Sequence, residues 1–244
     1  MEAIAQTTSH RQLLSKPKQT NNRSNKSGNL QVKIPVKKLP ARREAGSTRR
    51  GSCISGDPAL LALLLPTTNL GLTSAAYPQF FWYSPKNTAQ QTKFSLYKID
   101  EQARTLLYNT TFKPSTEAGV TSLALPNQDK TSPLEINQTY YWTVSIICDL
   151  TDPSPSSVIT VDGWIQRVAL SQNVTNQLQQ LNSKERIPIY AEQGLWFDTL
   201  STVAELRACN PSDKNLSNLW INLLQQVELA EFAQQPLQQE CSRR

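Results

Sequence analysis

The segment Thr139–Asp149, with the sequence TYYWTVSIICD, constrains the fold more than any other part of this chain. Its residues alternate between two faces, a pattern that is typical of a β-strand with one buried face. Each inward side chain stabilises the folded state by roughly 1.5–3 kcal/mol when fully buried, so we expect this strand at the centre of the core. The inward side chains are predicted to be Tyr140, Trp142, Val144, Ile146 and Cys148.

Further segments of strand type occur on both sides of this one, and turns rich in Pro, Asn and Asp separate them. The predicted strands are Leu60–Leu65, Gln79–Tyr83, Phe94–Ile99, Thr105–Phe112, Val120–Leu125, Thr139–Cys148 and Val158–Val168. Strands at this spacing predict an antiparallel β-sandwich of the immunoglobulin or fibronectin type III kind. Tyr140, six residues after Leu134, resembles the corner tyrosine of such sandwiches, whose hydroxyl bonds to upstream backbone; an ordinary buried tyrosine is the alternative.

Helical spacing replaces strand alternation after Trp164, which we predict to be a core residue of the sandwich. We expect a helical hairpin or three-helix unit over residues 167–234, with Trp196 and Trp220 on its buried faces. Its helices are expected over Val168–Asn182, from Pro188 to Asn210, and from an N-cap at Ser212 or Asp213 onward. The predicted fold class is therefore α+β.

Basic charge is concentrated at the start of the chain. Residues 1–52 contain 12 Lys and Arg and 2 acidic residues, whereas residues 53–244 contain 13 Lys and Arg and 17 acidic residues. The composition of residues 1–52 predicts a disordered basic tail. Within it Leu30–Pro40 alternates like a strand, which indicates either a transient extended segment or a short strand docked on a sheet edge. The sandwich is expected over residues 53–166, and a frayed tail over 235–244.

No arrangement of side chains in the sequence indicates an enzyme. The only histidine, His10, lies in the basic tail, so a serine or cysteine nucleophile would lack its usual base. The four cysteines do not have the spacing of a zinc site, and there is no glycine-rich phosphate loop. Carboxylate pairs such as Glu192 with Asp198 fit no template, and solvated surface acids are the favoured interpretation. We expect no catalytic residue, no metal and no cofactor.

Four consecutive aromatic residues form a candidate interaction surface: Phe80, Phe81, Trp82 and Tyr83. A strand presents two of them on each face, so either both faces are covered or one aromatic pair is free to bind carbohydrate or a protein. We favour the first interpretation, in which the helical unit covers the second face, because large exposed apolar patches are uncommon on soluble monomers.

Cys53 and Cys148 are candidates for a disulfide, because one lies at the start of the predicted sandwich and the other at the end of its central strand. In an oxidising compartment the bond would close a long loop and stabilise the fold. In a reducing cytoplasm both residues would instead be small buried hydrophobic groups.

Six motifs follow one another in a defined order. They are RRGSC at 49–53, LLPTTNLGLT at 64–73, YPQFFWY at 77–83, YYWTVSIICD at 140–149, VDGWIQRV at 161–168, and the stretch from YAEQGLWF to LLQQVEL at 190–229. Together they resemble a family of domains of unknown function that is known mainly from cyanobacteria, over about residues 49–230. The resemblance implies no established activity and no catalytic residues. It also implies an export signal ahead of an Arg/Pro-rich spacer.

We therefore expect a non-enzymatic interaction or structural module that binds a protein or a component of the cell envelope. The alternative is binding of nucleic acid or an anionic surface through the basic tail. The longest apolar run, Ala59–Leu65, is too short to span a membrane, and the first thirty residues lack the pattern of a signal peptide. A periplasmic or secreted location is expected if the true start carries a signal, and a cytoplasmic location otherwise.

Overall fold

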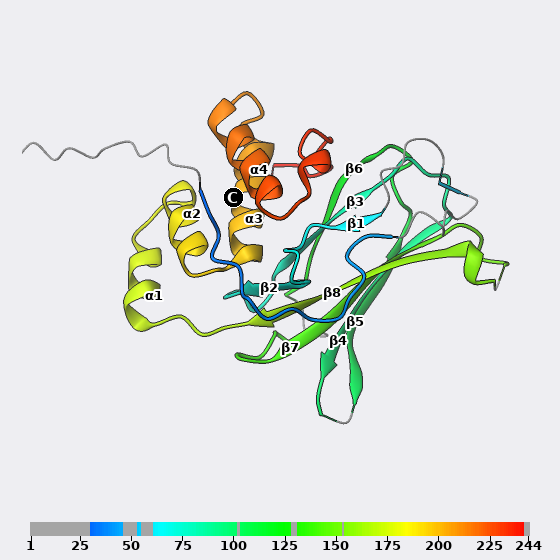
Figure 1. The fold of residues 1–244 in the computed structure, drawn as a ribbon, viewed down its shortest axis with the longest axis horizontal. Coiled ribbons are helices and arrows are strands. Elements are labelled where there is room, and N and C mark those ends of the chain that lie inside the picture. Colours follow the sequence, from blue (N-terminus) through cyan, green and yellow to red (C-terminus); the bar gives the residue numbers. More distant parts are fainter. Residues whose placement is uncertain are drawn as a thin grey trace, which may run out of the picture.

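The computed structural model describes residues 30–45, 53–54, 61–101, 103–127, 131–152 and 154–241 (Figure 1). Over these ranges the chain is a mixed α+β protein with two β-sheets and four α-helices, as predicted for the fold class. The strands are β1 (Ala62–Leu63), β2 (Leu70–Thr73), β3 (Gln79–Ser84), β4 (Gln91–Ile99), β5 (Arg104–Phe112), β6 (Gly119–Ala124), β7 (Thr139–Ile147) and β8 (Val158–Arg167). The helices are α1 (Gln172–Gln179), α2 (Ser183–Glu192), α3 (Trp196–Cys209) and α4 (Lys214–Gln226), with short 3-10 turns at Pro155–Ser157 and Ala230–Phe232.

Strand β7 lies in the middle of a five-stranded sheet with the order β2-β8-β7-β4-β5. Its inward side chains are at most 1% exposed, while the residues between them are partly exposed on the opposite face. These inward residues are Tyr140, Trp142, Val144 and Ile146. The alternation in the sequence therefore corresponds to a strand that separates the core from the outer face of this sheet.

Strand β2 was not predicted. It pairs in parallel with β8, from Leu70 beside Trp164 to Thr73 beside Arg167, so the five-stranded sheet is not wholly antiparallel. A parallel pair has no connecting hairpin, and the two strands are far apart in the chain. Four residues that include a glycine also give little strand signal by themselves.

Strand β3 is the central strand of a three-stranded sheet with the order β1-β3-β6. The ring of Phe80 lies 4.9 Å from the rings of both Phe94 and Trp142, so this face contacts the five-stranded sheet. On the opposite face Tyr83 stacks on Phe232 at 4.5 Å. The four consecutive aromatic residues of β3 are 0–3% exposed. Both faces are therefore covered, the second one by the C-terminal part of the chain.

The helical unit contains four helices instead of two or three. Gly194 has φ of 71°, a left-handed conformation that ends α2, so the helix expected from Pro188 to Asn210 is broken there. Helix α2 also begins before Pro188. The Asn182 side chain accepts the Glu185 N–H at 3.1 Å, and the Glu185 carboxylate accepts the Asn182 N–H at 3.2 Å. This capping box fixes the start of α2 and places Pro188 inside it.

Helices α3 and α4 begin close to the predicted positions, and their tryptophans are buried. The Asp213 side chain accepts the backbone N–H of Asn215 at 2.8 Å and so caps α4, as expected. Trp196 and Trp220 are 0% exposed. The Trp196 indole N–H donates to the carbonyl of Leu64 at 2.8 Å, which joins α3 to the end of β1. In the described ranges none of the helices is both long and apolar enough to cross a membrane.

Residues 30–45, here called the N-terminal strap, cross the front of the molecule in extended form (Figure 1). The Gln226 side chain bonds the backbone N–H and carbonyl of Val32, at 2.9 and 2.6 Å, and the Lys33 N–H donates to Ala191 O at 3.0 Å. Further along, Leu39 N donates to Thr68 O and Ala45 N to Leu61 O. Leu30–Pro40 is therefore extended and docked on the fold, which is closer to the second of the two alternatives left open for it. The disorder expected for the rest of residues 1–52 does not extend to residues 41–45, which are also docked. Residues 1–29 and 46–52 lie outside the described residues.

Trp164 is only partly buried, which differs from its predicted place in the core. It lies on the outer face of β8, because Ile159, Val161 and Ile165 hold the inward positions. The strap gives it a partner, since the Trp164 indole N–H donates to Pro40 O at 2.9 Å. The alternation in β7 alone could not predict which face of β8 carries Trp164. That face is set by the register between the two strands.

Residues 236–241, here called the C-terminal segment, were expected to be frayed but lie along the free edge of β6. Val120 N donates to Pro236 O and Gln238 N donates to Val120 O, both at 2.8 Å. Cys241 lies at disulfide distance from Cys209, with Cα atoms 4.7 Å apart. This second cysteine pair was not predicted, and it explains why the end of the chain stays docked.

Candidate functional site

A cleft of about 640 Å³ opens between the helical unit and the segment that connects β2 to β3. Helices α2 and α3 form one side, residues 73–79 form the other, and the C-terminal segment reaches the rim through Gln239. Its polar lining residues include Tyr77, Gln79, Ser183, Arg186, Tyr190, Asp198, Ser201, Thr202, Glu205 and Gln239. A concave site of this size, built from distant parts of the chain, is typical of ligand-binding pockets.

Asp198 holds the helix side and the strand side of the cleft together. Its carboxylate accepts the Ser74 hydroxyl at 2.5 Å and the Ser74 backbone N–H at 3.1 Å. Burial raises the pKa of this carboxyl, although the hydrogen bonds from Ser74 and Thr73 act in the opposite direction. Asp198 lies in the first turn of α3, where a negative charge also faces the positive end of the helix dipole.

Tyr190 and Arg186 line the side of the cleft formed by α2. Burial, followed by the nearby Asp198 charge, raises the pKa of the Tyr190 hydroxyl, which therefore stays protonated at neutral pH. Arg186 opposes this shift, and its Nε–H donates to Leu178 O at 2.9 Å. Tyr190 presents its phenol ring, and Arg186 its guanidinium group, to the same cleft.

Glu205, Gln239 and Cys209 form the outer end of the cleft. Gln239 donates to Glu205 at 2.9 Å and accepts from Gln79 at 3.2 Å. Glu205, Cys209 and Cys241 also lie close enough to hold a metal ion in principle. The sulfur atoms of Cys209 and Cys241 are bonded to each other, however. Cysteine binds a metal ion as a thiolate, which a disulfide does not provide. In the described residues this cluster therefore serves as a tether of the C-terminal segment.

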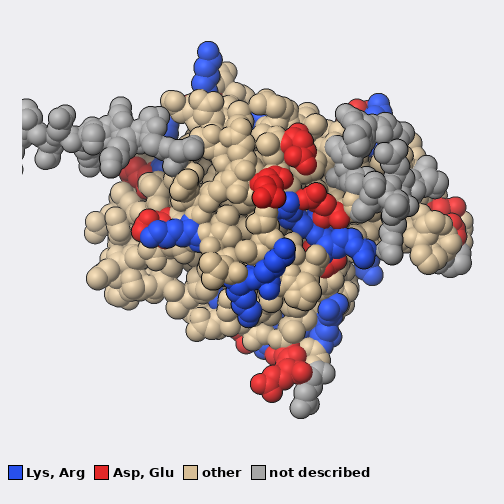
Figure 2. All heavy atoms as spheres, viewed as in Figure 1, with Lys and Arg blue, Asp and Glu red and all other residues tan. Residues whose placement is uncertain are grey.

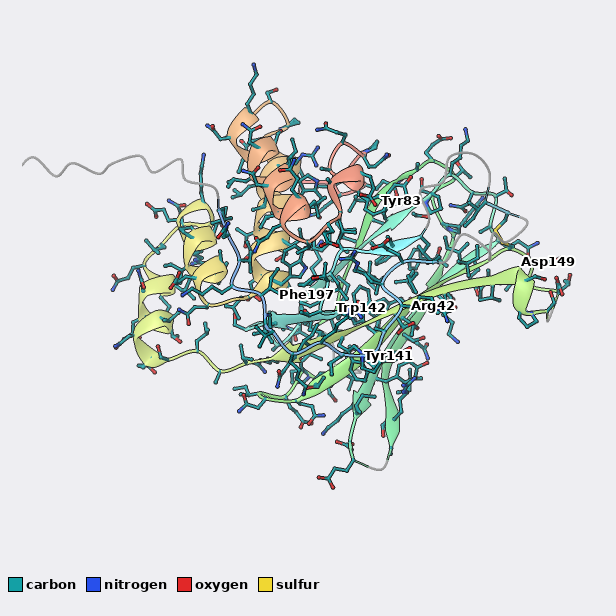
Figure 3. All side chains as sticks on the ribbon, viewed as in Figure 1. Arg42, Tyr83, Tyr141, Trp142, Asp149 and Phe197 are labelled. Carbon is teal, nitrogen blue, oxygen red and sulfur yellow. A yellow bond between two sulfur atoms is a disulfide. The ribbon has the colours of Figure 1, made fainter. Side chains whose placement is uncertain are left out.

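The aromatic residues of β3 do not form the interaction surface considered above. Phe80, Phe81, Trp82 and Tyr83 are all buried, so none of them is available to a partner. Figure 3 shows Trp142 and Phe197 close together in the interior, and their ring centroids lie 6.4 Å apart. The consecutive aromatics thus build the core between the two sheets and α3.

A group of partly exposed aromatic residues lies instead on the outer face of the five-stranded sheet. Tyr97, Tyr141 and Trp164 are neighbours across β4, β7 and β8, and the Arg104 guanidinium lies 4.0 Å from the centre of the Tyr141 ring. Tyr141 and Arg42 lie on this side of the molecule in Figure 3. The Arg42 N–H donates to Asp162 at 3.1 Å, so much of this surface serves to dock the strap.

The sulfur atoms of Cys53 and Cys148 lie at disulfide distance, with Cα atoms 5.2 Å apart. All four cysteines of the chain are thus in two pairs. The two pairs differ in exposure. Cys53 and Cys148 are 5% and 7% exposed, whereas Cys209 and Cys241 are partly exposed.

The carboxylates considered in the sequence do not form a catalytic pair. Glu192 makes an ion pair with Lys33 of the strap, whereas Asp198 binds Ser74. His10 lies outside the described residues. The cleft itself was missed, because its residues come from segments that no local pattern connects. No local signal in the sequence linked Asp198, which lies inside the helix predicted from Pro188 to Asn210, to Ser74, which lies outside the six motifs.

A comparison with known protein families gives a match over most of the chain. The family model described as Domain of Unknown Function (DUF928) matches residues 44–237. The chain belongs to this family. The matched range includes both sheets, all four helices and every side chain of the cleft except Gln239. A search of curated proteins found no match to the DUF928 chain.

Proposed function

We propose that this DUF928 chain is a non-enzymatic interaction module that binds a protein or a component of the cell envelope in the cleft between α2, α3 and residues 73–79. The observation that carries the proposal is the cleft itself, with hydroxyl, amide, carboxylate, guanidinium and phenol groups around one concave space. Such a lining provides donors, acceptors and ring surfaces for a polar ligand.

The state of the polar groups supports binding in preference to catalysis. Asp198 is hydrogen-bonded to Ser74, and the Ser201 and Thr202 hydroxyls donate to the Asp198 carbonyl at 3.2 and 2.7 Å. A catalytic nucleophile needs a base within hydrogen-bond distance. The Ser201 and Thr202 hydroxyls line the cleft and have a backbone partner that holds them in place, so we propose a recognition role for them.

The cysteine pairs support a location in an oxidising compartment. Disulfides persist in secreted and periplasmic proteins and are rare in a reducing cytoplasm. With all four cysteines paired, we propose that the chain acts outside the cytoplasm.

We further propose that the two sheets form a sandwich related to the immunoglobulin or fibronectin type III kind. The contacts of Phe80 with Phe94 and Trp142 across the two sheets support this. So does the Tyr140 hydroxyl, which accepts the Glu135 backbone N–H at 2.8 Å, as a corner tyrosine does.

Binding of nucleic acid or an anionic surface through the basic tail is the second candidate, because residues 1–52 hold most of the excess positive charge. Part of this charge is used within the fold, since Arg43 donates to the carbonyls of Leu65 and Val227 at 3.1 and 2.7 Å. In Figure 2 both basic and acidic side chains occupy the visible face. The folded part therefore adds no uniform positive field to the tail.

A sedimentation assay tests the first proposal with the isolated envelope fraction of the producing cells. Thr202→Trp fills the cleft from α3, and Thr111→Trp is the matched control on the exposed edge strand β5. We expect saturable co-sedimentation of the wild type and the control, and at least about tenfold weaker binding of Thr202→Trp, equivalent to about 1.4 kcal/mol. Equal binding of both variants, or no saturable binding of the wild type, would overturn the proposal.

A deletion of residues 1–29 separates the second candidate from the first. Binding through the tail predicts a steep dependence on salt concentration that becomes weaker in the shortened chain, which loses five of the 12 Lys and Arg of residues 1–52. Binding through the cleft predicts that the affinity for the envelope fraction survives the deletion.

A further inference from the structure

The C-terminal segment is attached to the fold mainly by hydrogen bonds, several of which involve the side chains of Gln238 and Gln239. Its backbone bonds Val120 of β6 through Pro236 O and Gln238 N, and the Thr121 hydroxyl donates to the Gln238 side chain at 2.9 Å. Leu237 packs only partly against the core. Short, polar edge pairing of this kind is weak without another constraint. The Cys209–Cys241 disulfide supplies that constraint at the end of the segment.

The same segment closes the outer end of the cleft. Cys209 and Gln239 both line the cleft, and Gln239 is bonded to Gln79 on the strand side and to Glu205 on the helix side. Movement of residues 236–241 away from β6 would remove Gln239 from both partners. The size of the cleft opening and the position of the segment are therefore coupled.

The two disulfides differ in their accessibility to a reductant. Cys209 and Cys241 are partly exposed, whereas Cys53 and Cys148 are 5% and 7% exposed within the core. Thiol–disulfide exchange requires direct attack of a thiolate on sulfur, so exposure decides which bond reacts first. Reduction can therefore act on the C-terminal segment while the Cys53–Cys148 bond stays intact.

We propose that Cys209–Cys241 is a redox latch, which a dithiol reductant opens to release residues 236–241 from β6 and widen the cleft. This inference rests on the proposed binding function of the cleft. It also predicts that the freed edge of β6 exposes backbone donors and acceptors, which is the kind of edge that accepts an added strand.

The reaction is a two-electron exchange. A thiolate of the dithiol attacks the sulfur of Cys209, the S–S bond breaks, and its electron pair leaves on Cys241, which is then protonated. The second thiol of the reductant attacks the mixed disulfide, releases the Cys209 thiol, and leaves the reductant as a disulfide. Glu205 Oε1 lies 3.6 Å from the sulfur of Cys209. The Glu205 carboxylate lies within 4.8 Å of both sulfur atoms, so its negative charge disfavours the approach of an attacking thiolate.

Amide hydrogen exchange on the full chain tests the latch without any ligand. We compare the untreated protein, the protein in dithiothreitol, and Cys209→Ser/Cys241→Ser, with Cys53→Ser/Cys148→Ser as the matched control. In the second and third samples we expect the amides of Val120 and Gln238 to exchange at least about tenfold faster, while Val144 in β7 stays protected. Unchanged protection of Val120 and Gln238 would overturn the latch and leave the cleft proposal to its own binding test.

The order of reduction is measured by alkylating free thiols during treatment with dithiothreitol under native conditions. We expect Cys209 and Cys241 to be labelled first, and Glu205→Gln to speed their reduction, since the variant removes the neighbouring negative charge. Labelling of Cys53 and Cys148 at the same rate as the second pair would contradict the selectivity on which the latch depends.

Discussion

The carboxylate of Asp198 accepts both the hydroxyl of Ser74, at 2.5 Å, and its backbone N–H, at 3.1 Å. This contact joins the first turn of α3 to the residue that follows β2. It therefore fixes the position of the helices relative to the five-stranded sheet, and it determines where the cleft opens. The geometry explains why two parts of the chain that are separated by more than a hundred residues form one site.

Ser74→Ala removes a donor from a carboxylate that the fold has largely withdrawn from water. Loss of one partner of such a bond destabilises a protein by about 1–3 kcal/mol. We expect a decrease of this size in the free energy of unfolding, measured by urea denaturation at neutral pH. Ser217→Ala is a suitable comparison, because the Ser217 hydroxyl makes only a long bond, of 3.3 Å, to Asp213 O within its own helix. Equal losses for the two variants would contradict the role given to Ser74.

The pH dependence of stability gives a second test of Asp198. Its folded pKa is raised, so ionisation is harder in the folded state than in the unfolded chain, where the pKa is about 4. The stability contributed by the protonated group is present below pH 4 and is lost as the pH rises through the raised pKa. Asp198→Asn removes this titration. We expect the loss of stability between about pH 4 and the raised pKa to be smaller in the variant, and an unchanged pH profile would show that Asp198 is not its source.

Ile146 and Ile147 offer a comparison of the two faces of β7 with one residue type. Ile146 is 0% exposed, whereas Ile147 is partly exposed on the outer face. Ile146→Ala is expected to lower the free energy of unfolding by about 2–5 kcal/mol, because it leaves a cavity in the core. Ile147→Ala is expected to have a much smaller effect. Chemical denaturation of both variants checks the assignment. Comparable losses in the free energy of unfolding would contradict the assignment of Ile146 to the buried face of β7.

Tyr140→Phe removes the hydroxyl that accepts the Glu135 N–H at 2.8 Å. An unpaired donor at this partly buried position is expected to destabilise the fold by about 1–3 kcal/mol. Tyr108→Phe on β5 is the control, because the Tyr108 ring packs against Phe94 and the change keeps that ring contact. A Tyr140→Phe protein as stable as the wild type would remove the support that this residue gives to a corner of the sandwich type.

The Cys53–Cys148 bond joins residues that are 95 positions apart and ties the start of the folded part to the end of β7. Closing a loop of that length contributes about 4–5 kcal/mol in the chain-entropy model, and loss of native disulfides commonly lowers stability by about 2–5 kcal/mol. We expect Cys53→Ser/Cys148→Ser to show a loss in this range in thermal and urea unfolding without reductant. Dithiothreitol should not add a loss of the same size to this variant, because its only remaining bond is the C-terminal one.

Local patterns predicted the strands and helices that carry strong periodicity. β7 and α4 are examples, because strict alternation and the i, i+3, i+4 stripe are properties of consecutive residues. β2 was missed because its partner β8 is distant in sequence. Docking of the C-terminal segment was missed for a similar reason, and docking of Leu30–Pro40 stayed one of two alternatives, since both depend on edges and grooves that exist only after the sheets form.

The candidate site could not be predicted as a unit. Asp198 was noticed only as a possible partner of Glu192, and Ser74, its hydrogen-bond partner, lies outside the six motifs. The aromatic residues of β3 attracted attention by their number, and the fold uses them in the core. Exposure, which decides whether a ring can meet a partner, depends on packing between segments and not on composition.

The most direct test of the account places a photoreactive benzoylphenylalanine at Ser183, an exposed residue that lines the cleft, or at Thr111 on β5 as the control, in the cells that produce the chain. The account predicts that illumination joins the Ser183 protein to an envelope component, and that excess wild-type chain, but not excess Thr202→Trp, prevents this adduct. An adduct that forms equally from Thr111, or the absence of any adduct from Ser183, would contradict binding in the cleft.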